Sequence, residues 1–114
     1  MHLLVTCSGI SNTGRLTSQA AQSLVQRYPG RVSWAEVQRP PDELRERADE
    51  ATGMIILNGC ADCCATKKLR SAGIDAGFEL VATELGIRKN GMAEVQFCEI
   101  ETVVGAVLME LNRK

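Results

Sequence analysis

The sequence lacks a long hydrophobic run and a surplus of charge of either sign. Its longest apolar stretch, Val103 to Met109, is about seven residues long, far short of the ~20 residues that a membrane-spanning helix needs. The formal net charge is −1 and no basic run occurs, so the electrostatic signature of a nucleic-acid-binding surface is missing. We therefore expect neither a membrane nor a nucleic acid as a partner.

Targeting signals and aromatic residues are also scarce. Residues 1–5 carry no basic segment and the chain turns polar at Thr6, which favours a first strand over a signal peptide. Trp34 is the sole tryptophan, beside one tyrosine and two phenylalanines, and this gives little support to an aromatic partner-binding surface. We expect a cytoplasmic protein.

Cysteine, in contrast, is abundant, with five residues in 114. Thiols stay reduced in the cytoplasm, so this number indicates metal or redox chemistry before disulfides. Three of the five form a cluster, Cys60-Ala61-Asp62-Cys63-Cys64, which follows the apolar run 54–57 and precedes a helix-like stretch. Unpaired N–H groups at the start of a helix favour thiolate, the form that binds metals and attacks electrophiles. Cys7 follows an earlier apolar run in the same way.

Short apolar runs alternate with helix-patterned stretches along the whole chain, which is typical of a parallel α/β sheet. A hydrophobic content of 45 % and a charged content of 24 % fit one compact domain, residues 1–114, and no repeat or linker is visible. We predict a three-layer α/β fold with a four-stranded, mostly parallel sheet in the flavodoxin-like order 2-1-3-4. The predicted strands are residues 2–7, 32–37, 53–58 and 78–84.

Helices are predicted after each of the first three strands and at the C-terminal end. The first carries Leu16, Ala20, Leu24 and Tyr28 at helical spacing, and the last carries a stripe of five apolar residues. The second begins at Pro40-Pro41, where proline is favoured. The third follows the cysteine cluster and ends near Gly73, and residues 85–96 are predicted as a long loop. The apolar residues of the last helix are Ile100, Val104, Val107, Leu108 and Leu111.

Ligands of open parallel sheets bind beyond the carboxyl ends of the strands, where the strand order reverses. In the order 2-1-3-4 the first and third strands are neighbours, so Cys7 and Cys60 would face each other across one strand spacing of ~4.8 Å. Sulfurs around a zinc ion lie about 3.8 Å apart, given Zn–S bonds of ~2.3 Å. Small loop adjustments would therefore bring these thiols to ligand distance.

Three groups of residues carry a resemblance to a known family. Cys7-Ser8-Gly9 opens a polar loop that ends Asn12-Thr13-Gly14, Asn58-Gly59-Cys60 is followed by Cys-Ala-Thr-Lys-Lys at 64–68, and residues 80–87 are Leu-Val-Ala-Thr-Glu-Leu-Gly-Ile. The chain resembles the DGC-domain family over nearly its whole length. Members are described as zinc-binding proteins with a central Asp-Gly-Cys motif and several chelating cysteines. The resemblance implies Cys7, Cys60 and Cys64 as zinc ligands.

This chain departs from the family pattern in three ways. Asn58 stands where the family has aspartate, Cys63 is additional, and a further cysteine is absent from the first loop and the second strand. The fourth ligand is therefore open between Cys63 and Cys98. Three thiolates and a water would form an open site of the catalytic kind, whereas four thiolates would close the site.

Other chemistries stay open beside zinc binding. An enzyme could use Cys7 or Cys60 as a nucleophile or redox thiol, with Cys63 or Cys64 as the resolving thiol. An iron–sulfur cluster ranks below zinc because adjacent cysteines are not a usual cluster spacing. Residues 8–14 could bind an anion, yet low-molecular-weight phosphatases place an arginine six residues after their cysteine, and position 13 here is threonine. No catalytic residue is identified by the sequence.

Overall fold

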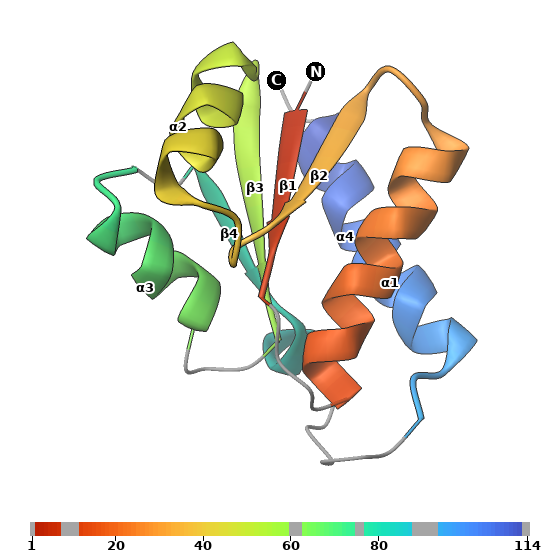
Figure 1. Ribbon diagram of the computed structural model, residues 1–114. Coiled ribbons are helices and arrows are strands. Elements are labelled where there is room, and N and C mark those ends of the chain that lie inside the picture. Colours follow the sequence, from red (N-terminus) through yellow and green to blue (C-terminus); the bar gives the residue numbers. More distant parts are fainter. Residues whose placement is uncertain (1, 8–11, 60–62, 75–76, 88–93, 113–114) are drawn as a thin grey trace.

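The computed structural model describes residues 2–7, 12–59, 63–74, 77–87 and 94–112, the side chain of Cys64 excepted. Strands and helices alternate along the chain, as predicted (Figure 1). No helix within these described ranges is long and apolar enough to span a membrane. In chain order the elements are β1 (His2–Thr6), α1 (Asn12–Arg27), β2 (Val32–Glu36), α2 (Pro41–Glu50), β3 (Gly53–Asn58), α3 (Cys64–Ser71), β4 (Phe78–Val81), the 3-10 helix η1 (Ala82–Leu85) and α4 (Phe97–Leu111).

The four strands form one parallel sheet in the order β2-β1-β3-β4, which confirms the predicted order. Strand β1 lies inside the sheet and pairs on both sides, so that Leu4 is opposite Trp34 of β2 and Ile55 of β3. Strand β4 pairs with β3, and its last residue, Val81, is opposite Asn58. The first and third strands are thus neighbours, as the expected site requires.

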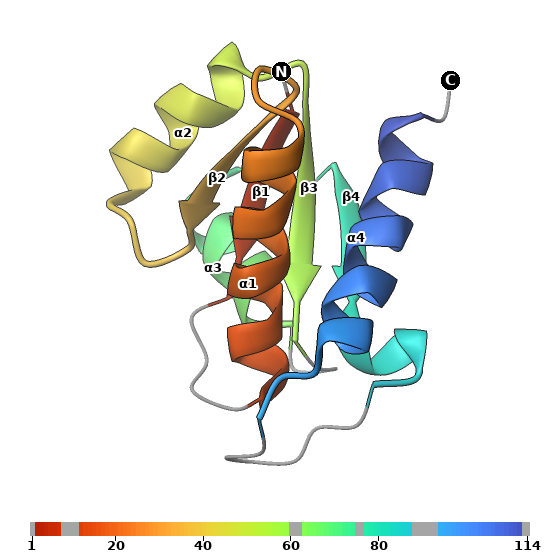
Figure 2. The ribbon, with the colours of Figure 1, turned by 90° about the vertical axis from the view of Figure 1, so that its right-hand side faces the viewer.

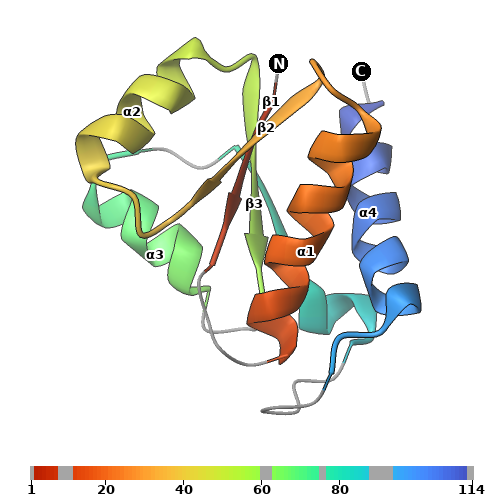
Figure 3. The same ribbon diagram turned by 45° about the vertical axis from the view of Figure 1, so that its right-hand side comes forward.

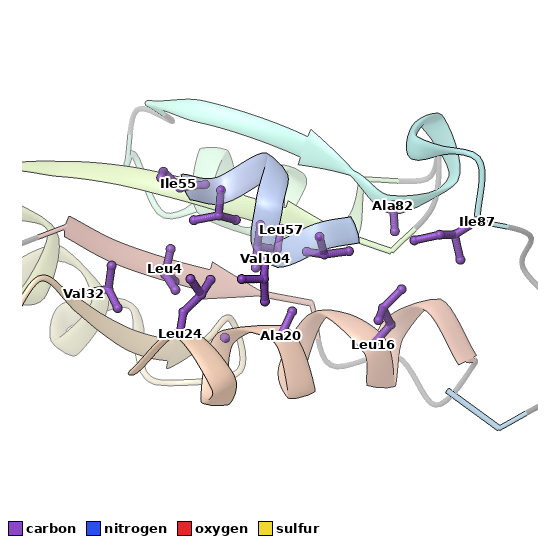
Figure 4. Packing of buried hydrophobic residues seen from close by; sticks show 13 residues of the cluster. Leu4, Leu16, Ala20, Leu24, Val32, Ile55, Leu57, Ala82, Ile87 and Val104 are labelled. Carbon is purple, nitrogen blue, oxygen red and sulfur yellow. The ribbon is translucent and has the colours of Figure 1, made fainter. Parts of the chain in front are cut away.

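Helices cover both faces of the sheet. Figures 1 and 2 show α1 and α4 on one face and α2 and α3 on the other. Because successive side chains of a strand point to opposite faces, Leu4 packs in the core beneath α1 and α4, whereas Leu3 and Val5 pack in the core beneath α2 and α3. Figure 4 shows Leu24 of α1 and Val104 of α4 meeting Leu4 in the first of these cores. A strand buried on both faces needs a continuous apolar run, which β1 has.

The residues at the start of α2 and of α4 favour the beginning of a helix. Helix α2 opens with Pro41, whose missing N–H needs no partner there, and Asp42 and Glu43 follow in the positively polarised first turn. At α4, the Gln96 N–H donates to the Glu99 carboxylate at 2.8 Å, and the Gln96 side chain accepts a bond from the Glu99 backbone. This reciprocal capping box pairs two donors that the helix itself cannot satisfy.

The predicted end of the fourth strand, residue 84, is wrong. Strand β4 ends at Val81 and the next four residues form η1. The ladder stops because its partner β3 ends at Asn58, directly opposite Val81. The turn into η1 brings Ala82 and Ile87 into the core beneath α1 and α4 (Figure 4).

One edge of the sheet gathers strand ends and helix starts. Figure 3 shows β1 and β3 ending close to where α1 and α3 begin. We call this the carboxyl edge. The end of α4 and the start of β1 lie at the opposite edge (Figure 1). The positive ends of the α1 and α3 helix dipoles lie at the carboxyl edge, which favours anionic groups such as thiolates there.

Candidate functional site

Cys7 directly follows β1 and its side chain is only 7 % exposed. Its backbone N–H donates to the Leu57 carbonyl at 3.3 Å, so the contact between β1 and β3 continues one residue beyond Thr6, which pairs with Leu57. The side chain shares a core cluster with Ala65 and Leu69 of α3. Cys7 therefore lies at the carboxyl edge, on the face of the sheet that α3 covers.

The thiol of Cys7 has a hydroxyl neighbour on α1. Its Sγ lies 3.7 Å from Thr17 Oγ1, and Thr17 is itself 1 % exposed. The Thr17 hydroxyl donates to the Gly14 carbonyl at 2.8 Å. A hydroxyl has one proton to give, so Thr17 accepts from Cys7 in this arrangement and the sulfur is the donor. The structure thus describes Cys7 as a thiol held between α1 and α3.

Asn58 is the next residue of the ladder on β3 and is buried, with 1 % exposed. Since Thr6 is opposite Leu57, Asn58 is the register neighbour of Cys7. Its Nδ2 donates to Thr66 Oγ1 of α3 at 2.9 Å, whereas its buried Oδ1 has no hydrogen-bond partner among the described residues. A buried polar atom left unpaired costs about 1–3 kcal/mol. This oxygen is therefore an exception that needs an explanation.

The chain leaving β3 passes directly against the first turn of α1. A Cβ atom placed on Gly59 would lie 2.9 Å from the Thr13 carbonyl carbon and 3.0 Å from the Gly14 nitrogen. Real Cβ atoms do not come this close to a backbone, so only glycine fits at this crossing. The contact holds the segment that leads to the cysteine cluster against α1, the same helix that carries the Thr17 neighbour of Cys7.

The cysteine cluster is described in part. Cys63 precedes α3 as its N-cap, half-buried, with φ 50° and ψ 48° in the left-handed region. A non-glycine residue pays about 1–2 kcal/mol to adopt this conformation. Cys64 is the first residue of α3. Cys60 and the side chain of Cys64 lie outside the described residues, so their roles as ligands stay predictions.

Cys98 lies in a different helical layer from Cys63 and Cys64. It is exposed in the first turn of α4, the helix on the face of the sheet opposite α3 (Figure 1). Its carbonyl accepts a bond from the Thr102 hydroxyl at 2.9 Å. Among the described residues, no three histidine, cysteine or acidic side chains come together in a group that could hold a metal ion.

Two neighbours of Cys7 were not among the predicted site residues. Asn58 entered the sequence analysis as a departure from a motif, and Thr17 did not enter it. A signal for Thr17 does exist, because Thr13, Thr17 and Ala21 recur at four-residue spacing and all three are buried. Small or polar residues on a buried helix stripe indicate a close approach or a polar contact there.

A separate cavity of about 390 Å³ lies along the edge strand β2. Trp34, Glu36 and Arg39 contribute to its lining. Trp34 Nε1 donates to Thr6 Oγ1 at 2.9 Å, so the indole is anchored to β1. The cavity therefore begins at the carboxyl end of β2, where Glu36 is opposite Thr6.

Comparison with known proteins bears on the family. No curated protein and no solved structure matches this chain. The DGC-domain family model matches residues 3–107, which is most of the chain and includes every cysteine. The chain therefore belongs to the DGC-domain family.

Proposed function

We propose that this protein binds a zinc ion through cysteine thiolates at the carboxyl edge of its sheet. Cys7, Cys60 and Cys64 are the proposed ligands, with Cys63 as a further thiol donor. Thiolate sulfur is a preferred ligand of zinc, and family membership supports the proposal. The site would carry, sense or simply retain the metal, and the cytoplasm is the compartment in which its thiols would stay reduced.

The observation that carries the proposal is the position of Cys7. Its buried side chain shares a core cluster with Ala65, the residue after Cys64. One core cluster thus contains the residue that follows β1 and the first turn of α3, although Cys7 and Cys64 are 57 positions apart in the sequence (64 minus 7). On binding, each cysteine would release its proton to solvent as the thiolate forms.

The donor set also fits a zinc ion chemically. An unpaired buried oxygen, Asn58 Oδ1, lies on the register neighbour of Cys7, which is the kind of atom that a cation satisfies. The Thr17 hydroxyl, which accepts from the thiol at 3.7 Å, can turn its proton toward a thiolate instead. A hydrogen bond to a ligating group is a common way to orient that ligand.

The alternative is a thiol enzyme that uses Cys7 or Cys60. A reactive cysteine is normally a partly exposed thiolate, and the burial of Cys7 does not favour that role for it. Such an enzyme predicts fast alkylation of one thiol by iodoacetamide in metal-free protein. Uniformly slow alkylation would argue against it.

Elemental mass spectrometry of anaerobically purified, untagged protein tests the zinc proposal. We expect about one zinc per chain in the wild type and a sharp loss in Cys7→Ser and Cys60→Ser. Cys98→Ser is the matched control, because this exposed thiol on α4 should leave the zinc content unchanged. Circular dichroism establishes that each variant is folded.

Two results would contradict the proposal. The first is reduced, folded wild-type protein that contains no metal and takes up none from added zinc. The second is a Cys7→Ser protein that keeps the zinc stoichiometry and affinity of the wild type.

A further inference from the structure

The carboxamide of Asn58 is held by a hydrogen bond to α3. Asn58 Nδ2 donates to Thr66 on α3, so the carboxamide extends from β3 toward the face that α3 covers. The side chain of Cys7 lies on the same face, in the cluster with Ala65. The two residues occupy neighbouring register positions, and adjacent strands lie about 4.8 Å apart. Asn58 and Cys7 are thus neighbours across two strands on the face of the sheet that α3 covers.

Among the residues that the structure describes, none donates a hydrogen bond to this oxygen. The proton of the Cys7 thiol is directed to Thr17 Oγ1, since the Thr17 hydroxyl spends its own proton on the Gly14 carbonyl. Asn58 Oδ1 stays buried without a partner. Burial of this oxygen without a hydrogen-bond donor is unfavourable. A cation bound to the oxygen would remove that penalty.

We propose that Asn58 Oδ1 is the fourth ligand of the metal ion, a neutral oxygen donor beside the thiolates of Cys7, Cys60 and Cys64, in the place that Cys63 would take in a four-thiolate site. This inference rests on the proposed function and names a ligand that is not a cysteine. Zinc accepts oxygen as well as sulfur ligands, and side-chain amide oxygens are established metal ligands.

Charge favours a neutral donor in this position. Three thiolates around a divalent cation carry a net charge of −1, and a fourth thiolate would raise this to −2. Uncompensated charge is costly in a buried site, and Cys7 and Asn58 are both buried. An amide oxygen completes four-coordination without adding charge. The Thr66 hydroxyl then acts as a positioning group, because it holds the amide nitrogen and so aims the oxygen.

Asn58→Leu tests the proposal, since leucine has a similar size and no oxygen. We expect its zinc affinity, measured by competition with a chromophoric chelator, to fall roughly tenfold or more. Cobalt(II) substitution then separates ligation from packing. Loss of an oxygen ligand should shift the d–d bands of the cobalt complex, while the sulfur-to-cobalt charge-transfer intensity, which follows the number of thiolates, stays unchanged.

Two further measurements keep the outcome clear. Asn58→Asp retains an oxygen donor but adds a negative charge, and it should therefore lose less zinc affinity than Asn58→Leu. Metal-free Asn58→Leu should be as stable as metal-free wild type or more stable, because the substitution removes an unpaired polar atom. Lower metal-free stability would mean that Asn58 serves the fold instead of the metal.

The ligand proposal is overturned if Asn58→Leu keeps the zinc affinity of the wild type, or if its affinity falls with unshifted d–d bands. In either case a zinc-loaded wild type would leave the proposed function standing. Wild-type protein that binds neither zinc nor cobalt would overturn both proposals.

Discussion

Gly59→Ala is the substitution whose effect follows most directly from the structure. The added methyl would lie 2.9 Å from the Thr13 carbonyl carbon, 3.0 Å from the Gly14 nitrogen and 3.1 Å from the Thr13 oxygen. All three are backbone atoms, so no side chain can rotate away and α1 or the end of β3 must move. Overpacking of this kind costs about 1–3 kcal/mol. The loss of unfolded-state entropy returns about 0.4–1 kcal/mol, which leaves a net destabilisation of roughly 0.5–2 kcal/mol.

Thermal unfolding of metal-free protein by circular dichroism measures this effect. At about 4 °C per kcal/mol for a domain of this size, the melting temperature of Gly59→Ala should fall by roughly 2–8 °C. Gly105→Ala is the matched control, because Gly105 is exposed within α4 and a Cβ there meets nothing within 4 Å. Alanine is favoured over glycine inside a helix by about 0.5–1 kcal/mol, so the control should melt roughly 2–4 °C higher than the wild type.

The same substitution should also weaken the proposed zinc site, since it pushes the segment that leads to the cysteine cluster away from α1. Zinc affinity of Gly59→Ala should fall while that of Gly105→Ala stays at the wild-type value. The reasoning is refuted if Gly59→Ala melts at or above the wild-type temperature, because the three backbone contacts could then not be as close as described.

Two further predictions concern the fold around the site. Trp34→Phe removes the indole donor to Thr6, whose hydroxyl is fully buried. The substitution should therefore lower the free energy of unfolding in urea by about 1–3 kcal/mol. An unchanged value would show that Thr6 finds another partner. The hydrogen bond from Arg27 lowers the pKa of Glu101 from its ordinary value of 4.5. Because the folded pKa lies below the unfolded one, the pair stabilises the fold above about pH 4.5 and loses this effect as the pH falls through the folded pKa. The stability advantage of the wild type over Glu101→Gln should therefore shrink from neutral pH toward about pH 3, and a constant advantage would contradict the reasoning.

The sheet could be predicted because its inner strands carry their own signal. Residues 3–5 of β1 and 54–57 of β3 are uninterrupted apolar runs, which strands need when both faces are buried. The end of β4 could not be predicted in the same way. Residues 80–83 are Leu-Val-Ala-Thr, which suit a strand locally, and β4 stops because the partner strand ends at Asn58. That cause lies more than 20 residues away in the sequence (81 minus 58).

The candidate site, like the sheet, could be predicted only in part from the sequence. The place of Cys7 at a strand end and of Cys64 at a helix start follows from local patterns, and the structure confirms both. The contact of Cys7 with Thr17 depends on how α1 packs on the sheet, and the free oxygen of Asn58 depends on which groups α3 presents to it. The four-residue spacing of Thr13, Thr17 and Ala21 indicates a buried stripe on α1, but it does not name Cys7 as the partner of Thr17.

The early turn from β4 into η1 has a consequence for how the molecule meets its own copies. An outermost strand with unpaired backbone groups can serve as a template on which another chain aligns, and short, charged outer strands resist this. Strand β4 has four residues, and the exposed Glu79 at its centre forms an ion pair with Arg70 at 3.8 Å. A second chain approaching this side would find only a brief stretch of backbone and a carboxylate that must be desolvated. The β4 edge of the sheet is thus a poor template for the addition of a strand from another chain.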